Sequence, residues 1–100
     1  MDIVTDGPEI LLAGDFDVRC TWQVRMALYD ALERHPRVVV DLGEVATVDV
    51  TALKVLAVAS RFAARRGGQV RLRGCNGAVR RLLHMTHLIR LVDVERDALV

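Results

Sequence analysis

The stretch RVVVDLGEVATVDVTAL, residues 37–53, decides how the rest of the chain is arranged. It begins with the β-branched run VVV, which is typical of a buried strand, and Asp41 and Gly43 are expected to end that strand. A helical pattern follows, so Asp49 and Thr51 are expected where a loop enters a helix. The first N–H groups of a helix lack partners and carry positive dipole charge, so a hydroxyl there is well placed to carry a phosphate. The alternative is that Asp49 or Thr51 simply caps the helix.

The length and composition of the chain indicate one small domain. Of the 100 residues, 52% are hydrophobic, and no apolar run approaches the roughly 20 residues of a membrane span. The acidic N-terminus lacks a signal-peptide pattern, and the two cysteines, Cys20 and Cys75, are far apart. We therefore expect a single domain over residues 1–100, no membrane insertion and a cytoplasmic location.

Charge is unevenly distributed along the sequence. The net charge is +1, yet residues 1–50 hold ten Asp and Glu against four Arg, while residues 51–100 hold ten Lys and Arg against three Asp and Glu. Such an asymmetry can serve partner docking or head-to-tail self-association, unless the fold interleaves the two halves. The low net charge and the few aromatics for base stacking argue against direct nucleic-acid binding.

Strand and helix patterns alternate along the chain. Strands are expected at residues 2–5, 9–13 (followed by a polar exit over 14–17), 37–41, 69–73 and within 89–94. Helices are expected at residues 20–34, 50–66 and 77–85, the last capped by Asn76, and a further short helix is expected at 96–100. This order predicts an α/β fold with a mostly parallel central sheet, an antiparallel N-terminal edge strand and helices packed on it.

The helix expected at 50–66 has two distinct faces. One stripe is the expected core face: Leu53, Leu56, Ala57, Ser60 and Ala64. A second, apolar ridge begins at the hydroxyl: Thr51, Val55, Val58 and Phe62. Basic residues flank this ridge: Lys54, Arg61 and Arg65. An apolar ridge with a basic rim favours a docking surface, and the alternative is a helix that is merely more buried than most.

No catalytic set is recognisable. The sequence has no phosphate-binding glycine loop and no nucleophile elbow. His84 and His87 lack a Cys or carboxylate companion at ligand spacing, so no metal site is expected. We expect neither an enzyme nor a bound cofactor.

Several segments together resemble the STAS domain, in particular the bacterial anti-sigma factor antagonists. They are GDFD at residues 14–17, VVVDLGEV at 38–45, VDVTAL at 48–53, the run from 63 to 68 before VRL, and AVRRLLHMTHL at 78–88. The resemblance covers about residues 8–97, nearly the whole chain. It implies a single STAS-like domain.

The resemblance also implies a partner-switching mechanism in transcription regulation and stress response. The unphosphorylated antagonist binds an anti-sigma factor, often a serine/threonine kinase, and so frees a sigma factor. By motif position, Thr51 is the phosphoacceptor, and its phosphorylation breaks the complex. The expected partner-binding residues are Asp17, Asp49, Val50, Ala52, Lys54, Val55, Val58 and Phe62.

The central motif departs from the family pattern. The family usually has Asp-Ser-Ser-Gly-Leu, whereas Val50 and Ala52 stand here on either side of Thr51. Lys54 replaces a small residue, and His87 replaces a glycine. Threonine at this position also occurs in STAS proteins of other roles. The alternative function is therefore a non-phosphorylated scaffold subunit of a transporter or stressosome-type assembly. The oligomeric state stays open, a dimer being one option.

Overall fold

A five-stranded sheet in the order β1-β2-β3-β4-β5 forms the frame of this computed structural model, which describes residues 1–95. The strands are β1 Asp2–Asp6, β2 Glu9–Phe16, β3 Arg37–Val48, β4 Gln69–Arg73 and β5 Asp93–Val94. The α-helices are α1 Thr21–Arg34, α2 Val50–Arg65 and α3 Gly77–Met85, with short 3-10 turns η1 Val18–Cys20 and η2 Leu88–Arg90. The short helix expected at 96–100 lies outside the described residues.

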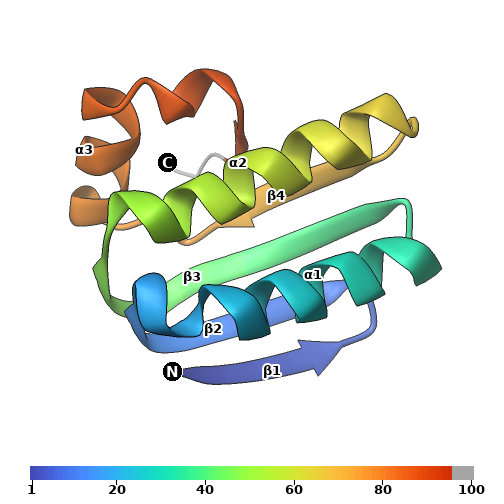
Figure 1. Cartoon of the computed structure of the whole chain (residues 1–100), viewed down its shortest axis with the longest axis horizontal. Helices are drawn as coiled ribbons and strands as arrows, with labels where there is room; N and C mark the ends of the chain where they lie inside the picture. Colours follow the sequence, from blue (N-terminus) through green and yellow to red (C-terminus); the bar gives the residue numbers. More distant parts are fainter. Residues whose placement is uncertain (96–100) are drawn as a thin grey trace.

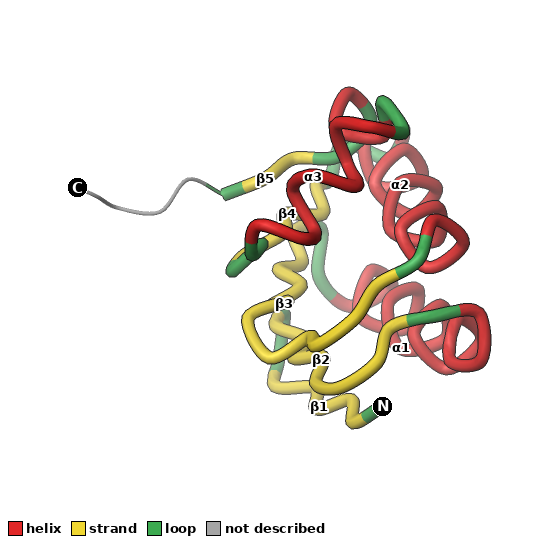
Figure 2. Tube along the Cα trace, turned by 90° about the vertical axis from the view of Figure 1, so that its left-hand side faces the viewer, coloured by secondary structure: helices red, strands yellow, loops and turns green. Residues whose placement is uncertain are grey.

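The predicted α/β architecture is confirmed. β1 pairs with β2 antiparallel, while β2, β3, β4 and β5 pair in parallel. Each βαβ connection returns the chain to the same end of the sheet, so α1 and α2 run side by side on one face (Figures 1 and 2). α3 lies beyond the N-terminal end of α2 (Figure 1).

Two strands are longer than predicted. Asp41 and Gly43 do not end β3, which continues to Val48, because its pairing with β2 shifts register and lets the chain pass the glycine as a bulge. β2 likewise runs to Phe16, whose side chain is fully buried, so residues 14–17 are not the polar exit that we expected. These extensions carry both strands to the edge of the sheet where α1 and α2 begin.

The chain also differs from the prediction at the start of α1 and after α3. The first helix begins at Thr21 rather than at residue 20, because a separate 3-10 turn precedes it. Residues 89–94 are not one strand: η2 occupies the first part, and within this stretch only Asp93–Val94, β5, pairs with β4. His87, with φ 63° and ψ 7°, turns the chain out of α3 and into η2.

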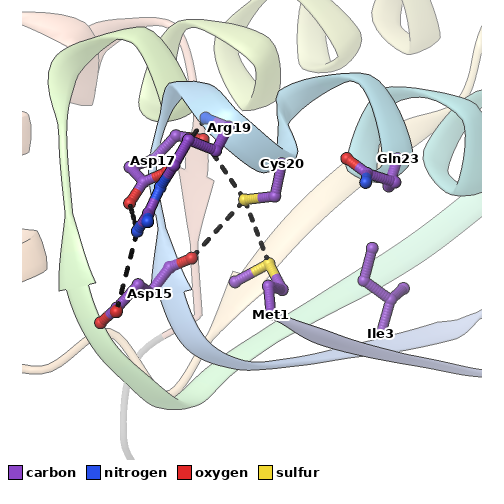
Figure 3. A pocket seen from close by; sticks show the side chains of 7 residues that line it. All are labelled: Met1, Ile3, Asp15, Asp17, Arg19, Cys20 and Gln23. Carbon is purple, nitrogen blue, oxygen red and sulfur yellow. Dashed lines mark hydrogen bonds and ion pairs between the residues drawn. The ribbon is translucent and has the colours of Figure 1, made fainter.

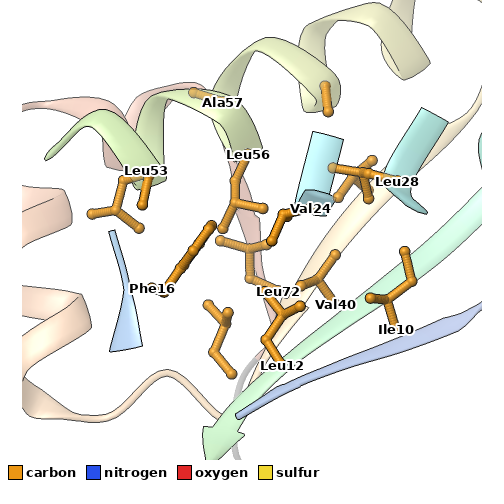
Figure 4. Packing of buried hydrophobic residues seen from close by; sticks show 14 of the residues in the cluster. Ile10, Leu12, Phe16, Val24, Leu28, Val40, Leu53, Leu56, Ala57 and Leu72 are labelled. Atoms are coloured by element: carbon orange, nitrogen blue, oxygen red, sulfur yellow. The ribbon is translucent and has the colours of Figure 1, made fainter. Parts of the chain in front are cut away.

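The core fills the space between the sheet and the two long helices (Figure 4). Its largest fully buried side chains include Phe16 from β2, Leu28 from α1 and Leu56 from α2. The predicted core stripe of α2 is buried except for Ala64, which is exposed, because Ala63 instead faces inward. A helix of 3.6 residues per turn rotates its inward face by one position over this length.

Candidate functional site

Asp49 joins β3 to α2, and each of its two carboxylate oxygens accepts a backbone hydrogen bond. Its Oδ1 accepts a hydrogen bond from the Ala52 N–H at 2.8 Å, which is an N-cap bond. Its Oδ2 accepts from the Val18 N–H at 3.1 Å, in the turn before α1. The capping alternative therefore holds for Asp49, and this one side chain ties the starts of α1 and α2 together.

The predicted site residues on α2 separate into three levels of exposure. Thr51 and Lys54 are exposed in the first turns, and Val58 is 53% exposed. Val50, Val55 and Phe62 are partly buried. Ala52 is fully buried, so its methyl group packs in the core and does not face a partner.

Asp17 lies at the same edge of the sheet but is engaged locally. Its Oδ1 accepts from the Arg19 N–H at 3.0 Å, and its Oδ2 lies 2.7 Å from Arg19 Nη2 (Figure 3). These hydrogen bonds from the Arg19 side chain and backbone lower the pKa of Asp17 from 3.8 to about 2. Asp17 therefore caps the short turn before α1 as an ionised carboxylate.

A hollow of about 380 Å³ lies beside Asp17 (Figure 3). Its lining combines β1, β2, η1 and α1: Met1, Ile3, Asp15, Asp17, Arg19, Cys20 and Gln23. The Cys20 thiol lies 3.5 Å from Met1 Sδ and is buried, so its surroundings are those of a packed thiol. Within residues 1–95 no group of three His, Cys, Asp or Glu side chains is placed to hold a metal ion.

The contribution of α1 to this surface was not predicted from the sequence. A hollow of about 310 Å³ separates α1 from α2 at the level of Thr51. Its α1 side is formed by Thr21, Arg25 and Tyr29, and its α2 side by Thr51, Lys54, Val55 and Val58. The four-residue spacing of the α1 residues places them on one helix face and is the signal that was available in the sequence.

The groove continues toward the C-terminal ends of the two helices. A second hollow of about 280 Å³ is lined by Tyr29, Val58, Arg61, Phe62 and Arg65. Tyr29 and Phe62 meet edge to face with ring centroids 4.9 Å apart. The Arg66 guanidinium lies 5.1 Å from the centre of the Phe62 ring. Phe62 therefore fixes α1 against α2 at the floor of the groove rather than projecting freely.

No helix in the described part of the chain is both long and apolar enough to cross a bilayer.

The site consists of an exposed hydroxyl, Thr51, at the first turn of α2, followed by a groove with apolar and cationic walls. This arrangement offers a contact surface and a modifiable hydroxyl, without a set of nucleophile, base and oxyanion donors.

Comparison with known proteins gives a consistent fold assignment. A family model described as "Mlab, STAS domain" matches residues 2–93. A search of curated proteins found no match. A putative anti-sigma factor antagonist from Thermotoga maritima superposes with a TM-score of 0.78 at 19% identity, covering 97% of this chain and 86% of that chain.

Two further solved structures have the same fold. An anti-sigma factor antagonist from Mycobacterium paratuberculosis has a TM-score of 0.76 at 19% identity, covering 96% of this chain and 84% of that one. SpoIIAA, a Bacillus cell fate determinant and anti-sigma factor antagonist, has been solved in unphosphorylated and phosphorylated forms. These two forms have TM-scores of 0.75 and 0.69 at 14% and 12% identity, and cover 96% of this chain and 88% and 91% of theirs.

Proposed function

The chain belongs to the STAS domain family, and from this premise we propose that it is an anti-sigma factor antagonist. In this proposal it acts in the cytoplasm without catalysing a reaction. It binds an anti-sigma factor of the serine/threonine kinase type through the surface that begins at Thr51, and thereby frees a sigma factor. The full-length likeness in fold to solved antagonists supports the proposal.

The observation that carries the proposal is the position of Thr51. Asp49 already caps α2, so the Thr51 hydroxyl is not needed as the cap and stands exposed in the first helical turn. Lys54 and Val58 continue the exposed surface along the helix from the same point. A kinase can therefore approach the hydroxyl from the side on which a partner would dock.

Phosphorylation of Thr51 is the proposed switch. A phosphate adds close to two negative charges, which oppose docking at an apolar contact through desolvation and repulsion. Asp49 lies two residues away and adds to the negative charge. The start of a helix is also a favourable place for a phosphate, because its dipole and free N–H groups stabilise an anion.

A scaffold subunit of a transporter or stressosome-type assembly is the second candidate. Val50 and Ala52 favour it, because they replace the small polar residue and the glycine usual around the phosphoacceptor. In this candidate the same surface binds its partner without a phosphorylation cycle.

Intact-mass measurement on protein purified from its native host separates the two candidates. The switch predicts a mass increase of one phosphate that is absent in Thr51→Ala and retained in Thr47→Ala, a control at an exposed threonine on β3. A protein that carries no phosphate, even after incubation with candidate kinases, contradicts the switch. Identification of the partner by pull-down then decides which assembly the scaffold serves.

A further inference from the structure

The outer face of α1 and the turn before it carries apolar side chains that the core does not use. Val18, Trp22 and Met26 are 60%, 66% and 53% exposed. Trp22 and Met26 are four residues apart and so lie on one face of α1, and Val18 precedes them in η1, whereas Val24 and Leu28 face the sheet. Trp22 and Met26 directly follow Thr21 and Arg25, which line the groove, so the three exposed residues, the α1 crest, lie on the face next to the groove wall. Exposed apolar side chains in a row are typical of a contact surface.

The charged side chains that line the groove all have the same sign. Arg25 and Lys54 line its first hollow, and Arg61 and Arg65 line its second. Neither hollow is lined by an Asp or Glu among the described residues. Because the whole chain has a net charge of only +1, this clustering is local and is not a reflection of general basicity.

We propose that the groove between α1 and α2 takes an acidic amphipathic helix of the partner protein. The apolar side of that helix packs on Tyr29, Val55 and Val58 and reaches the α1 crest. The carboxylates of that helix pair with the cations on both walls of the groove. This pairing requires the partner helix to be negatively charged and fixes its orientation in the groove. The inference rests on the proposed function, because it specifies the chemistry of the partner at the same surface.

The dimensions of the groove fit a helix. α1 has 14 residues and α2 has 16, so their lengths are about 21 and 24 Å at 1.5 Å per residue. A partner helix of about four turns matches that span and can pack in the groove between α1 and α2. An extended segment would leave its backbone polar groups facing apolar side chains, since no strand edge of the described chain lines either hollow.

Thr51 lies in the same hollow as Arg25 and Lys54. A phosphate on its hydroxyl would attract these two cations through charge-assisted hydrogen bonds. Those cations would then be less available to the partner's carboxylates. The switch therefore acts by competition for the same positive charges, in addition to repulsion of an acidic partner.

A selection experiment tests the inference while the partner is still unidentified. The probe is a phage library of random 16-residue peptides, selected against the purified, unphosphorylated chain. We expect the enriched peptides to be net acidic with apolar residues at helical spacing. Binding of the labelled winners, followed by fluorescence anisotropy, should weaken with rising salt.

Matched charge reversals locate the binding site. Lys54→Glu should weaken the affinity for the selected peptides about tenfold, because it places a negative charge in the groove wall. Arg71→Glu makes the same charge change at an exposed position on β4, outside the groove, and should leave the affinity unchanged. Val58→Asp should abolish binding by placing a charge in the apolar contact.

Three outcomes would overturn the inference: enrichment of neutral or basic peptides, no enrichment, or equal effects of Lys54→Glu and Arg71→Glu. Binding of a labelled single-stranded oligonucleotide with no peptide enrichment would assign the cations to nucleic acid instead. If Thr51 carries phosphate but the selected peptides are not acidic, the groove does not bind an acidic helix and the phosphorylation switch still stands. If the selected peptides are acidic but Thr51 carries no phosphate, the groove binds an acidic helix and the switch is excluded.

Discussion

Replacement of Asp49 by alanine removes two hydrogen bonds at the point where β3 enters α2. The first is the cap bond from the Ala52 N–H, and the second is the bond from the Val18 N–H that ties in the start of α1. Loss of an N-cap typically costs about 1 kcal/mol. The second bond is exposed, so its loss adds only about 0.5 kcal/mol. We expect the free energy of unfolding to fall by about 1.5 kcal/mol.

Urea unfolding followed by far-UV circular dichroism measures this loss. For a domain of this size the same change lowers the melting temperature by about 6–12 °C. Asp49→Asn is the matched control: its amide oxygen can still accept the cap bond, whereas its NH2 group cannot accept from the Val18 N–H, so it should lose only about 0.5 kcal/mol. A loss below about 0.5 kcal/mol in Asp49→Ala, or equal losses in both variants, would refute the assignment of Asp49 as the cap.

Three further measurements test other parts of the structure. In Arg19→Ala, the pKa of Asp17 should rise from about 2 toward 3.8 in an NMR titration. Because the folded-state pKa is lowered, the ionised carboxylate stabilises the wild type above about pH 4, and this contribution is lost as the pH falls toward 2; an unchanged pKa would contradict it. His87→Gly should raise the stability by about 0.5–1 kcal/mol by relieving a positive φ, whereas His84→Gly inside α3 should lower it by a few tenths; equal effects in thermal melts would exclude strain. Gly68→Ala should cost at least about 2 kcal/mol in urea unfolding, because a Cβ there collides with a backbone carbonyl, and a cost near zero would argue against that close approach.

The sequence predicts α2 and α3 because each of these helices carries a start signal. Asn76 caps α3 as expected and Asp49 caps α2, which was the alternative given for that position, through bonds of 3.0 and 2.8 Å to the N–H groups three residues ahead. The single antiparallel edge also follows from the two opening strands joined by a short turn. These features depend on residues close together in the sequence, which is where local patterns are informative.

The length of β3 was not predictable from the same patterns. Leu42 and Val45 are both buried although they are three positions apart, which breaks the two-residue alternation of a strand. The break reflects the shifted pairing with β2, and a bulge is fixed by the partner strand rather than by the local sequence. A glycine such as Gly43 therefore indicates either a strand end or a bulge.

The sequence predicts the α2 side of the candidate site but not the α1 side. The spacing along α2 identifies Thr51 and Val58 as surface residues. It does not reveal that Tyr29 and Arg25 form the opposite wall, because that depends on how closely α1 packs against α2. Ala52 is the converse case: its place in the motif made it a candidate contact, while its place on the helix buries it fully.

Trp22 gives the molecule a built-in optical reporter. It is the only tryptophan in the sequence, and its indole is 66% exposed on the α1 crest. The ring is already largely exposed to water in the folded domain, so its fluorescence emission should change little when the domain unfolds. A partner that covers the crest moves the ring into an apolar surrounding and shifts the emission to shorter wavelength. Emission from the unmodified protein can thus distinguish occupancy of the groove from loss of the fold, with no label attached.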